Sequence, residues 1–534
     1  MLGKRTAQLG FFESDYLYLE FVGADSFYGY LSCQRDNLFR DDDFTELYCP
    51  DNGRPGVPPS QLAIALLLQT YDKVSDEEAK ARADYDIRWK VALGIKVEDR
   101  PFAKSTLQLF RSQLILNEKM RDMFKRSLEL AKEAGYLKQR KMKVVLDTTN
   151  ILGRGAVKDT YNLLADGIRK LMRELAKPTQ QSYKVWVDGN GYERYLASSI
   201  KGEAEVDWDL ESARDEFLKG IVLDAERLLI LAKATAKNEK EQKSIEPHIA
   251  LLKQLIGQDV ERHGEAMKLK KGVAKDRVIS VQDPEMRHGR KSSSKLFNGH
   301  KASIAVDSES QLITAVEVLA GNVSDPTQAL ELTQKSESNT GLDVEETIGD
   351  CAYGDGNTRQ TFVDANRKLV AKMAQHGRHN QLNKEQFQID LEKMSCTCPA
   401  GTTTTQLIPQ GKSEDKDGKI IPHRAFLFDA VICTTCPVRS DCIKAKTKDR
   451  GRTIHLHPQE GLLQEARALQ KSDAFKDYRQ LRQVVEHRFA RLAQLGIRQA
   501  RYKGRKKTLF QLTMAATVAN LTLVATKTGQ LRPR

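Results

Sequence analysis

Two aspartates each follow a short apolar segment that we expect to be a β-strand. Asp147 comes after Val144–Leu146, and Asp350 comes after a segment through Thr347 and Ile348. Open α/β sheets usually hold their sites at the carboxyl ends of strands, so the two carboxylates could share one site. An Asp at a strand end is also common as a turn or helix cap, so neither residue is decisive alone.

A third carboxylate, Glu486, lies in a segment that we predict to be one helix over Asp473–Leu495, ended by Gly496. Its apolar side chains recur at steps of four, four and three residues and must face the core: Leu481, Val485, Phe489 and Leu492. Arg479, Arg482 and Glu486 form a neighbouring stripe, which places Glu486 beside the sheet with Arg482 one turn before it. A structural ion pair between Arg482 and Glu486 would explain the same spacing.

The elements that must position these carboxylates follow one another along the chain. A strand ends at Asp147, a β-hairpin is predicted over Ser303–Val318, a second strand ends at Asp350, and a helix begins near Thr358. The late helix with Glu486 comes last. This is the order of an RNase H-like nucleotidyltransferase core, so we predict a mixed α/β fold.

Other regions surround or interrupt this core. The predicted organisation is a helical N-terminal domain, the first part of the core, a helical insertion, the core with its hairpin and second Asp strand, a cysteine-bearing insertion without regular structure, and the C-terminal part of the core. The respective boundaries are 1–140, 141–158, 159–275, 276–374, 375–460 and 461–534.

The sequence pattern of the N-terminal region predicts short helices. One helix starts at Pro58-Pro59-Ser60, and a capping box of Ser75 and Glu78 opens a second that runs towards Gly94. A third follows Pro101, with Leu107, Phe110 and Leu114 on its apolar side and donors on its polar side: Lys104, Ser105, Gln108 and Arg111. This pattern suits a helix-turn-helix-like DNA reader, and it equally suits an ordinary helical bundle with a solvated face.

Cysteines cluster late in the chain. Cys433 and Cys436 form a Cys-x-x-Cys pair, with Cys442 after it and Cys398 before it, so four thiolates could hold one structural Zn²⁺. Cys396 and His423 are alternative ligands. A set of reduced cysteines in a loop is the plain alternative.

Charge favours a polyanionic partner. The 534 residues carry 85 Lys and Arg against 72 Asp and Glu, a net charge of +13. Residues 498–507 alone hold six cations and no acid: Arg498, Arg501, Lys503, Arg505, Lys506 and Lys507. The first twenty residues do not resemble an export signal, and the most apolar run, Leu512–Thr526, is interrupted by Thr and Asn, so we expect a cytoplasmic protein without a membrane segment.

Five segments together carry a family resemblance. The run Leu146–Thr160 resembles the first-Asp region of bacterial insertion-sequence DDE transposases, in the superfamily with a Tyr-Arg-Glu-Lys signature around the catalytic Glu. Four later segments resemble the later motifs of this group, in the same order: Asp283-Pro-Glu, Asn298-Gly-His-Lys-Ala, Gly349-Asp-Cys-Ala-Tyr-Gly and the run Tyr478–Glu486. Two positions depart from the signature, because Tyr478 lies one residue too far from Arg482 and position 493 is Ala. Arg501 or Lys503 could replace the missing Lys.

This resemblance implies a DNA transposase with catalytic Asp147, Asp350 and Glu486. In-line phosphodiester transfer uses two divalent cations, so Asp147 would bridge two Mg²⁺ ions and each other acid would complete one, with Mn²⁺ able to substitute. Arg482 would contact a phosphate, and Lys301 and Arg479 are further candidate DNA contacts. Expected partners are transposon ends and target DNA, bound by a homodimer or larger assembly near the bacterial nucleoid.

Two alternative functions remain at this point. An RNase H-like nuclease would cleave DNA without joining it to a target. A domesticated DNA-binding regulator would keep the core without catalysis, although the intact acidic triad argues against this.

Overall fold

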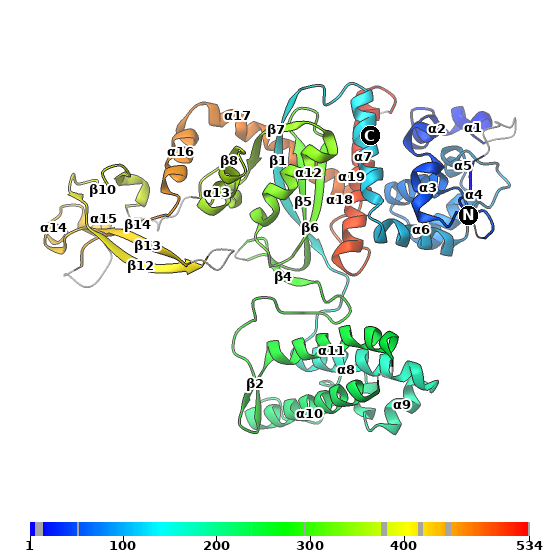
Figure 1. Cartoon of the computed structure of the whole chain (residues 1–534), viewed down its shortest axis with the longest axis horizontal. Helices are drawn as coiled ribbons and strands as arrows, with labels where there is room; N and C mark the ends of the chain where they lie inside the picture. Colours follow the sequence, from blue (N-terminus) through cyan, green and yellow to red (C-terminus); the bar gives the residue numbers. More distant parts are fainter. Residues whose placement is uncertain are drawn as a thin grey trace.

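The computed structural model describes residues 1–5, 14–50, 53–235, 238–292, 294–374, 382–414, 420–443 and 450–531. Figure 1 shows a central sheet with helices on both faces, a helical N-terminal region on the right, a helical lobe below and a cysteine-bearing arm on the left. The predicted mixed α/β fold is confirmed.

The central sheet has the strand order β4-β5-β1-β7-β8, with β6 also paired to β5. The strands are β1 (Lys141–Leu152), β4 (Arg287–Arg290), β5 (Leu296–Asp307), β6 (Ile313–Ala320), β7 (Asp343–Gly349) and β8 (Leu369–Ala371). Strand β1 is antiparallel to β5 and parallel to β7. The predicted hairpin is confirmed as β5–β6, and the predicted strand before Asp350 is confirmed as β7.

Strand β1 continues beyond Asp147, so the prediction that it ends there is wrong. Its parallel pairing with β7 stops at Val145, but its antiparallel pairing with β5 continues to Leu152. Only the pairing on the β7 side therefore ends near Asp147, which leaves that side open.

Helices cover both faces of the sheet. One face packs against α12 (Ala329–Thr340) and α13 (Gly356–Asp364), and the other packs against α18 (Gln483–Gln494) and α19 (Arg505–Lys527). Alternation along β1 sends Val144 and Leu146 to the first face, and Val145 and Ile151 to the second.

The predicted single helix over Asp473–Leu495 is two helices, α17 (Ala474–Leu481) and α18, and follows α16 (Glu460–Lys471). The break lies at Arg482, whose carbonyl accepts a hydrogen bond from the Val485 N–H three residues later, instead of the usual four. The end at Gly496 is confirmed, because this residue has a φ of +89° that favours glycine.

The N-terminal region is helical, as expected. Its helices are α1 (Ser14–Val22), α2 (Phe27–Leu38), α3 (Pro59–Asp72), α4 (Asp76–Tyr85), α5 (Ile87–Leu93), α6 (Lys104–Leu116) and α7 (Met120–Glu133). Ser75 caps α4 as predicted, by accepting from the Glu78 N–H. The helix expected to run on to Gly94 is interrupted, because the Asp86 side chain caps a new helix by accepting from the Arg88 N–H.

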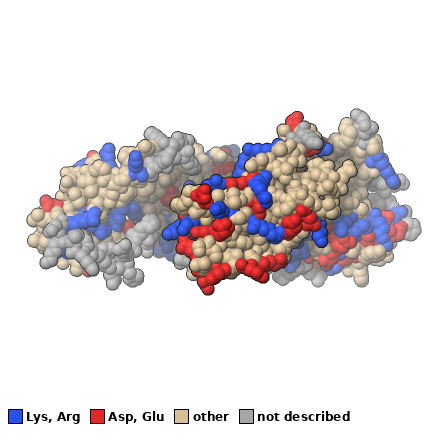
Figure 2. Space-filling view, turned by 90° about the horizontal axis from the view of Figure 1, so that it is seen from below, with Lys and Arg blue, Asp and Glu red and all other residues tan. Residues whose placement is uncertain are grey.

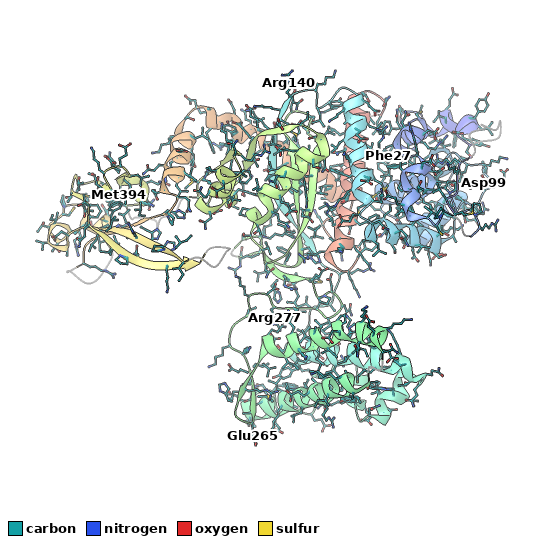
Figure 3. All side chains as sticks on the ribbon, viewed as in Figure 1. Phe27, Asp99, Arg140, Glu265, Arg277 and Met394 are labelled. Atoms are coloured by element: carbon teal, nitrogen blue, oxygen red, sulfur yellow. The ribbon has the colours of Figure 1, made fainter. Side chains whose placement is uncertain are left out.

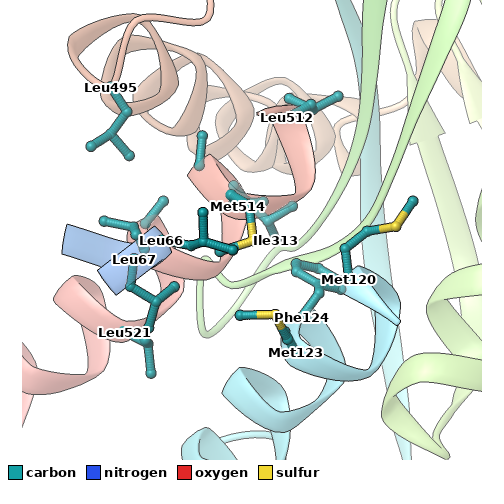
Figure 4. Packing of buried hydrophobic residues seen from close by; sticks show 14 of the residues in the cluster. Leu66, Leu67, Met120, Met123, Phe124, Ile313, Leu495, Leu512, Met514 and Leu521 are labelled. Carbon is teal, nitrogen blue, oxygen red and sulfur yellow. The ribbon is translucent and has the colours of Figure 1, made fainter. Parts of the chain in front are cut away.

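One hydrophobic cluster joins the N-terminal helices to the sheet. Figure 4 shows Leu66 of α3, Met123 of α7 and Ile313 of β6 packed around Leu512 and Met514 of α19. Helix α19 is long and apolar enough to cross a membrane, but 83% of its most apolar window is buried within the protein. It therefore acts as the central core helix, to which both the N-terminal region and the sheet are attached.

The helical lobe has its own hydrophobic cluster. It contains α8 (Thr160–Ala176), α9 (Tyr183–Gly189), α10 (Glu211–Thr235), α11 (Glu239–Asp259), β2 (Val260–His263) and β3 (Ala266–Leu269). The helical pattern predicted here is confirmed, and Figure 3 places Glu265 at the end of the lobe farthest from the sheet. Figure 2 shows basic and acidic side chains interspersed on the face seen from below, so this face is not uniformly positive.

The cysteine-bearing region contains two small sheets, so the prediction of an irregular segment is wrong. The strands are β9 (Gln388–Asp390), β10 (Ser395–Thr397), β11 (Thr403–Thr404), β12 (Leu407–Glu414), β13 (Ile420–Leu427) and β14 (Thr453–Leu456), with the short helices α14 (Ala430–Thr434) and α15 (Arg439–Cys442). Their small core consists of Phe387, Cys396, Phe426, Phe428, Cys442 and Ile454. Several of these strands are too short for a sequence period of two to be visible.

Candidate active site

A cleft of about 650 Å³ brings the three predicted carboxylates together. Asp147, Asp350 and Glu486 all line it, at the edge of the sheet where β1 and β7 diverge. The other lining residues include Thr148, Asn150, Leu152, Arg290, Lys291, Phe297, Lys301, Asp325, Phe489 and Arg498.

The register of the sheet explains why Asp147 and Asp350 meet. Val145 of β1 pairs with Ile348 of β7, and each aspartate lies two residues beyond its paired residue. Side chains two residues apart point to the same face of a strand, and Val145 and Ile348 both belong to the cluster on the α18 side. Both carboxylates are thus directed towards the helix that carries Glu486.

Helix α18 is fixed against this face by its apolar side chains. Val485 and Leu492 are fully buried in the same cluster, whereas Glu486, next to Val485, is exposed at the cleft. Arg482 precedes α18, and its guanidinium lies 3.9 Å from the Asp147 carboxylate. The predicted placement of Glu486 and Arg482 beside the sheet is therefore observed.

The electrostatics of the cleft are those of a carboxylate cluster. Burial raises the pKa of Asp147 to about 6, and the nearby carboxylates of Asp350 and Asp325 add to this increase, while Arg482 opposes it. A divalent cation would remove this repulsion, and carboxylate oxygens are the ligands that Mg²⁺ prefers, so the donor set fits the ion. Within the described residues, no three His, Cys, Asp or Glu side chains are positioned to hold one metal ion together.

The cleft contains a fourth acid that the sequence analysis missed. Asp325 begins a short 3₁₀ helix (Asp325–Gln328), and it accepts a 2.7 Å bond from the Lys301 ammonium group. Lys301 also donates to the Val323 carbonyl at 2.8 Å. Asp325 follows a loop instead of a strand, so the strand-end signal that identified Asp147 and Asp350 was absent.

Tyr478 and Arg479 lie outside the cleft lining. The Tyr478 hydroxyl donates to Glu346 of β7 at 2.8 Å, and the Lys143 ammonium lies over its ring. Arg479 is exposed on α17. The tyrosine thus holds α17 against the sheet.

The basic segment 498–507 is only partly available for a ligand. Arg498 lines the cleft, but Arg501 pairs with Asp76 at 3.4 Å and Arg505 pairs with Glu285 at 3.2 Å. The remaining cations of this segment are exposed at the surface: Lys503, which also donates to Gln282, and Lys506 and Lys507.

The predicted polar face of α6 is partly engaged in packing. Lys104 pairs with Glu77, Gln108 donates to Asp76 at 2.9 Å, and Ser105 is exposed. Arg111 is buried and forms a 2.6 Å ion pair with Asp76, so the expectation that it is presented on an outer surface is wrong.

Asp76 links the N-terminal region to the basic segment. Burial alone would raise its pKa, but hydrogen bonds from Arg111, Gln108 and Gln69 hold the pKa far below its ordinary value. Arg111 also stacks over the Tyr502 ring of the basic segment. Sequence spacing alone could not show this long-range pairing.

The four predicted zinc ligands line one small pocket. Cys398, Cys433, Cys436 and Cys442 surround it, and Cys396 and His423 do not. Burial raises the pKa of Cys442, and the nearby thiols add to this increase although Arg452 opposes it. The structure thus brings the four sulfurs near one another. Among the described residues, however, no group of three or more His, Cys, Asp or Glu side chains is positioned to hold a metal ion.

Two regions of the chain match known protein families. Residues 397–525 match a family described as "Transposase DDE domain", and residues 20–113 match one described as "Transposase domain (DUF772)". These matches indicate a transposase of the DDE type. No curated protein matches the chain.

The match to the DDE domain indicates the kind of chemistry that the family performs. DDE transposases are enzymes of the polynucleotidyl transferase type that act on DNA and generally use divalent metals. The matched region includes Glu486 and most of the cysteine-bearing arm from Thr397 onward, whereas Asp147 and Asp350 lie before it. The second match runs from the end of α1 to the last turn of α6 and does not include α7.

Proposed function

We propose that this protein is a transposase that binds insertion-sequence ends, cleaves them by Mg²⁺-dependent phosphodiester hydrolysis, and joins the freed 3′ ends to target DNA. Its catalytic core is of the RNase H-like type. The observation that carries the proposal is the shared cleft of Asp147, Asp350 and Glu486, at the open edge between β1 and β7.

Three acids of the cleft and the neighbouring Arg482 have separate roles in this proposal. Asp147, Asp350 and Glu486, which line the same cleft, would hold the Mg²⁺ ions through their carboxylates. When bound, such ions activate the attacking oxygen and stabilise the leaving oxygen. Arg482 orients the phosphate beside Asp147, and it corresponds with Glu486 to the Arg and Glu of the Tyr-Arg-Glu-Lys signature.

The surfaces around the cleft support DNA as the ligand. Arg498 at the cleft, with Lys506 and Lys507 nearby in the chain, supplies cations for phosphate contacts. We assign end recognition to the N-terminal region, where Lys104 and Ser105 at the start of α6 are exposed. Joining two ends to one target needs two active sites, so the productive complex contains at least two protomers.

Strand joining distinguishes a transposase from a nuclease. With labelled transposon ends, a target plasmid and Mg²⁺, we expect labelled ends covalently joined to the plasmid. Cleaved ends without joined product would favour the nuclease. No metal-dependent cleavage at all, by protein that binds the ends, would favour the regulator.

We also propose that Cys398, Cys433, Cys436 and Cys442 hold one structural Zn²⁺. The support is the donor chemistry, since four thiols line one pocket in an arm with a core of only six buried residues. A bound ion would tie the turn after β10, which carries Cys398, to the short helices α14 and α15.

The zinc proposal predicts about one zinc per chain in the purified protein. Cys433→Ser with Cys436→Ser should remove the zinc and make the arm sensitive to proteolysis, whereas Cys33→Ser, at an exposed cysteine in α2, should change neither. Elemental analysis and limited proteolysis measure both effects. Freshly purified wild-type protein without zinc would exclude the site.

A further inference from the structure

The β4–β5 hairpin, here residues 287–292 and 294–299, carries cations that the proposed function has not used. Arg290, Lys291 and Lys295 are exposed, and the first two line the cleft. Other cations near the cleft are neutralised, such as Lys301 by Asp325. Among the described residues, no acidic side chain forms an ion pair with any of the three hairpin cations. The hairpin therefore presents uncompensated positive charge beside a carboxylate cluster.

The hairpin has a fixed shape at its base. Arg287–Arg290 pair with Leu296–Gly299 in an antiparallel ladder, and the His288 ring bonds across it to Asn298 at 2.7 Å. The Phe297 ring covers Gly289 so closely that a Cβ there would lie 2.2 Å from it. The backbone that carries Arg290 is thus fixed before any ligand arrives, which lowers the entropic cost of binding.

The hairpin and the N-terminal region stand in different relations to the cleft, because Arg290 and Lys291 line it and no described residue of α1–α7 does. In Figure 1, β4 lies below the sheet towards the helical lobe, while α1–α6 lie to the right of α19. The basic segment contacts both regions: Arg501 pairs with Asp76 and Tyr502 stacks on Arg111, whereas Arg505 pairs with Glu285 just before β4. DNA that contacts the N-terminal helices and enters the cleft would place its scissile phosphate at the carboxylates and its continuation beside the hairpin.

We propose that the β4–β5 hairpin binds the phosphates of duplex DNA on the far side of the scissile bond. This DNA is the donor flank before cleavage and the target during joining. Arg290, Lys291 and Lys295 supply the contacts, which are electrostatic and independent of base sequence. The inference rests on the proposed function, because it takes the cleft as the cleavage site and the N-terminal region as the end-binding side.

The test compares two duplexes without divalent metal. One carries the terminal sequence that borders the gene and stops at the cleavage site, and the other continues into flanking DNA. Arg290→Ala, Lys291→Ala and Lys295→Ala together should weaken binding of the flanked duplex and reduce its salt slope by about 2.7, since each lost phosphate contact removes about 0.9. Binding of the precut duplex should stay as in the wild type.

A matched control is available at the other end of β1. Lys138, Arg140 and Lys141 are also exposed and have the same composition, and Figure 3 shows Arg140 at the top of the molecule, away from β4. Their alanine variant should bind both duplexes like the wild type. Thermal melting verifies that both variants are folded.

Two results would overturn the inference: an equal loss of affinity for both duplexes in the hairpin variant, or no loss for the flanked duplex. The proposed function fails differently, through absence of cleavage by the wild type in Mg²⁺. Because the binding comparison contains no metal, its outcome is separate from that failure.

Discussion

Asp147→Asn, Asp350→Asn and Glu486→Gln are each expected to abolish strand cleavage while end binding stays nearly unchanged. Each change removes one metal-binding charge from the cleft without altering the N-terminal helices. Loss of several kcal/mol of transition-state stabilisation corresponds to a rate decrease of about a thousand-fold or more. A labelled end duplex measures cleavage on a gel, and a band shift in metal-free buffer measures binding.

Asp343→Asn is the matched control for this series. Asp343 is the exposed first residue of β7, at the opposite end of the strand from Asp350. This variant should cleave like the wild type. A triad variant that still cleaves at the wild-type rate would remove its residue from the active site.

Asp76→Ala should lower the free energy of unfolding by about 3–5 kcal/mol, because it leaves the buried Arg111 guanidinium without its ion-pair partner. It also removes acceptors used by Gln69, Gln108 and Arg501. The basic segment would lose one of its links to the N-terminal region, so affinity for end DNA should fall as well. Denaturant unfolding monitored by circular dichroism gives the stability change.

The neighbouring residue provides the control for burial. Glu77 pairs with Lys104 at the surface, and an exposed ion pair contributes about 0–1 kcal/mol. Glu77→Ala should therefore unfold almost like the wild type. Equal destabilisation by the two changes would contradict the role assigned to the Asp76–Arg111 pair.

Local sequence patterns were sufficient to predict that the three carboxylates lie close together. Apolar runs before Asp147 and Asp350 indicated adjacent strands, and the stripe through Val485 and Leu492 indicated which side of the last helix is buried. These signals work because strand and helix periods determine side-chain direction locally. The same reasoning correctly placed the β5–β6 hairpin.

Features that depend on distant partners were not predictable in this way. Strand β1 continues past Asp147 because β5, more than 140 residues later, keeps pairing with it. Arg111 looked like a surface donor because its partner Asp76 and the ring of Tyr502 lie on other elements. Asp325 was missed because it begins a short 3₁₀ helix after a loop and does not end a strand.

Cleavage of the protein chain by bound iron tests the central claim most directly. With ascorbate and hydrogen peroxide added, Fe²⁺ in place of Mg²⁺ reduces the peroxide to hydroxyl radicals that cut the backbone close to the metal. The account predicts three groups of cuts, near Asp147, Asp350 and Glu486, that excess Mg²⁺ suppresses and that Asp147→Asn weakens together. Cuts confined to other segments, or unchanged cuts in the Asp147→Asn variant, would contradict a shared metal-binding site in this cleft.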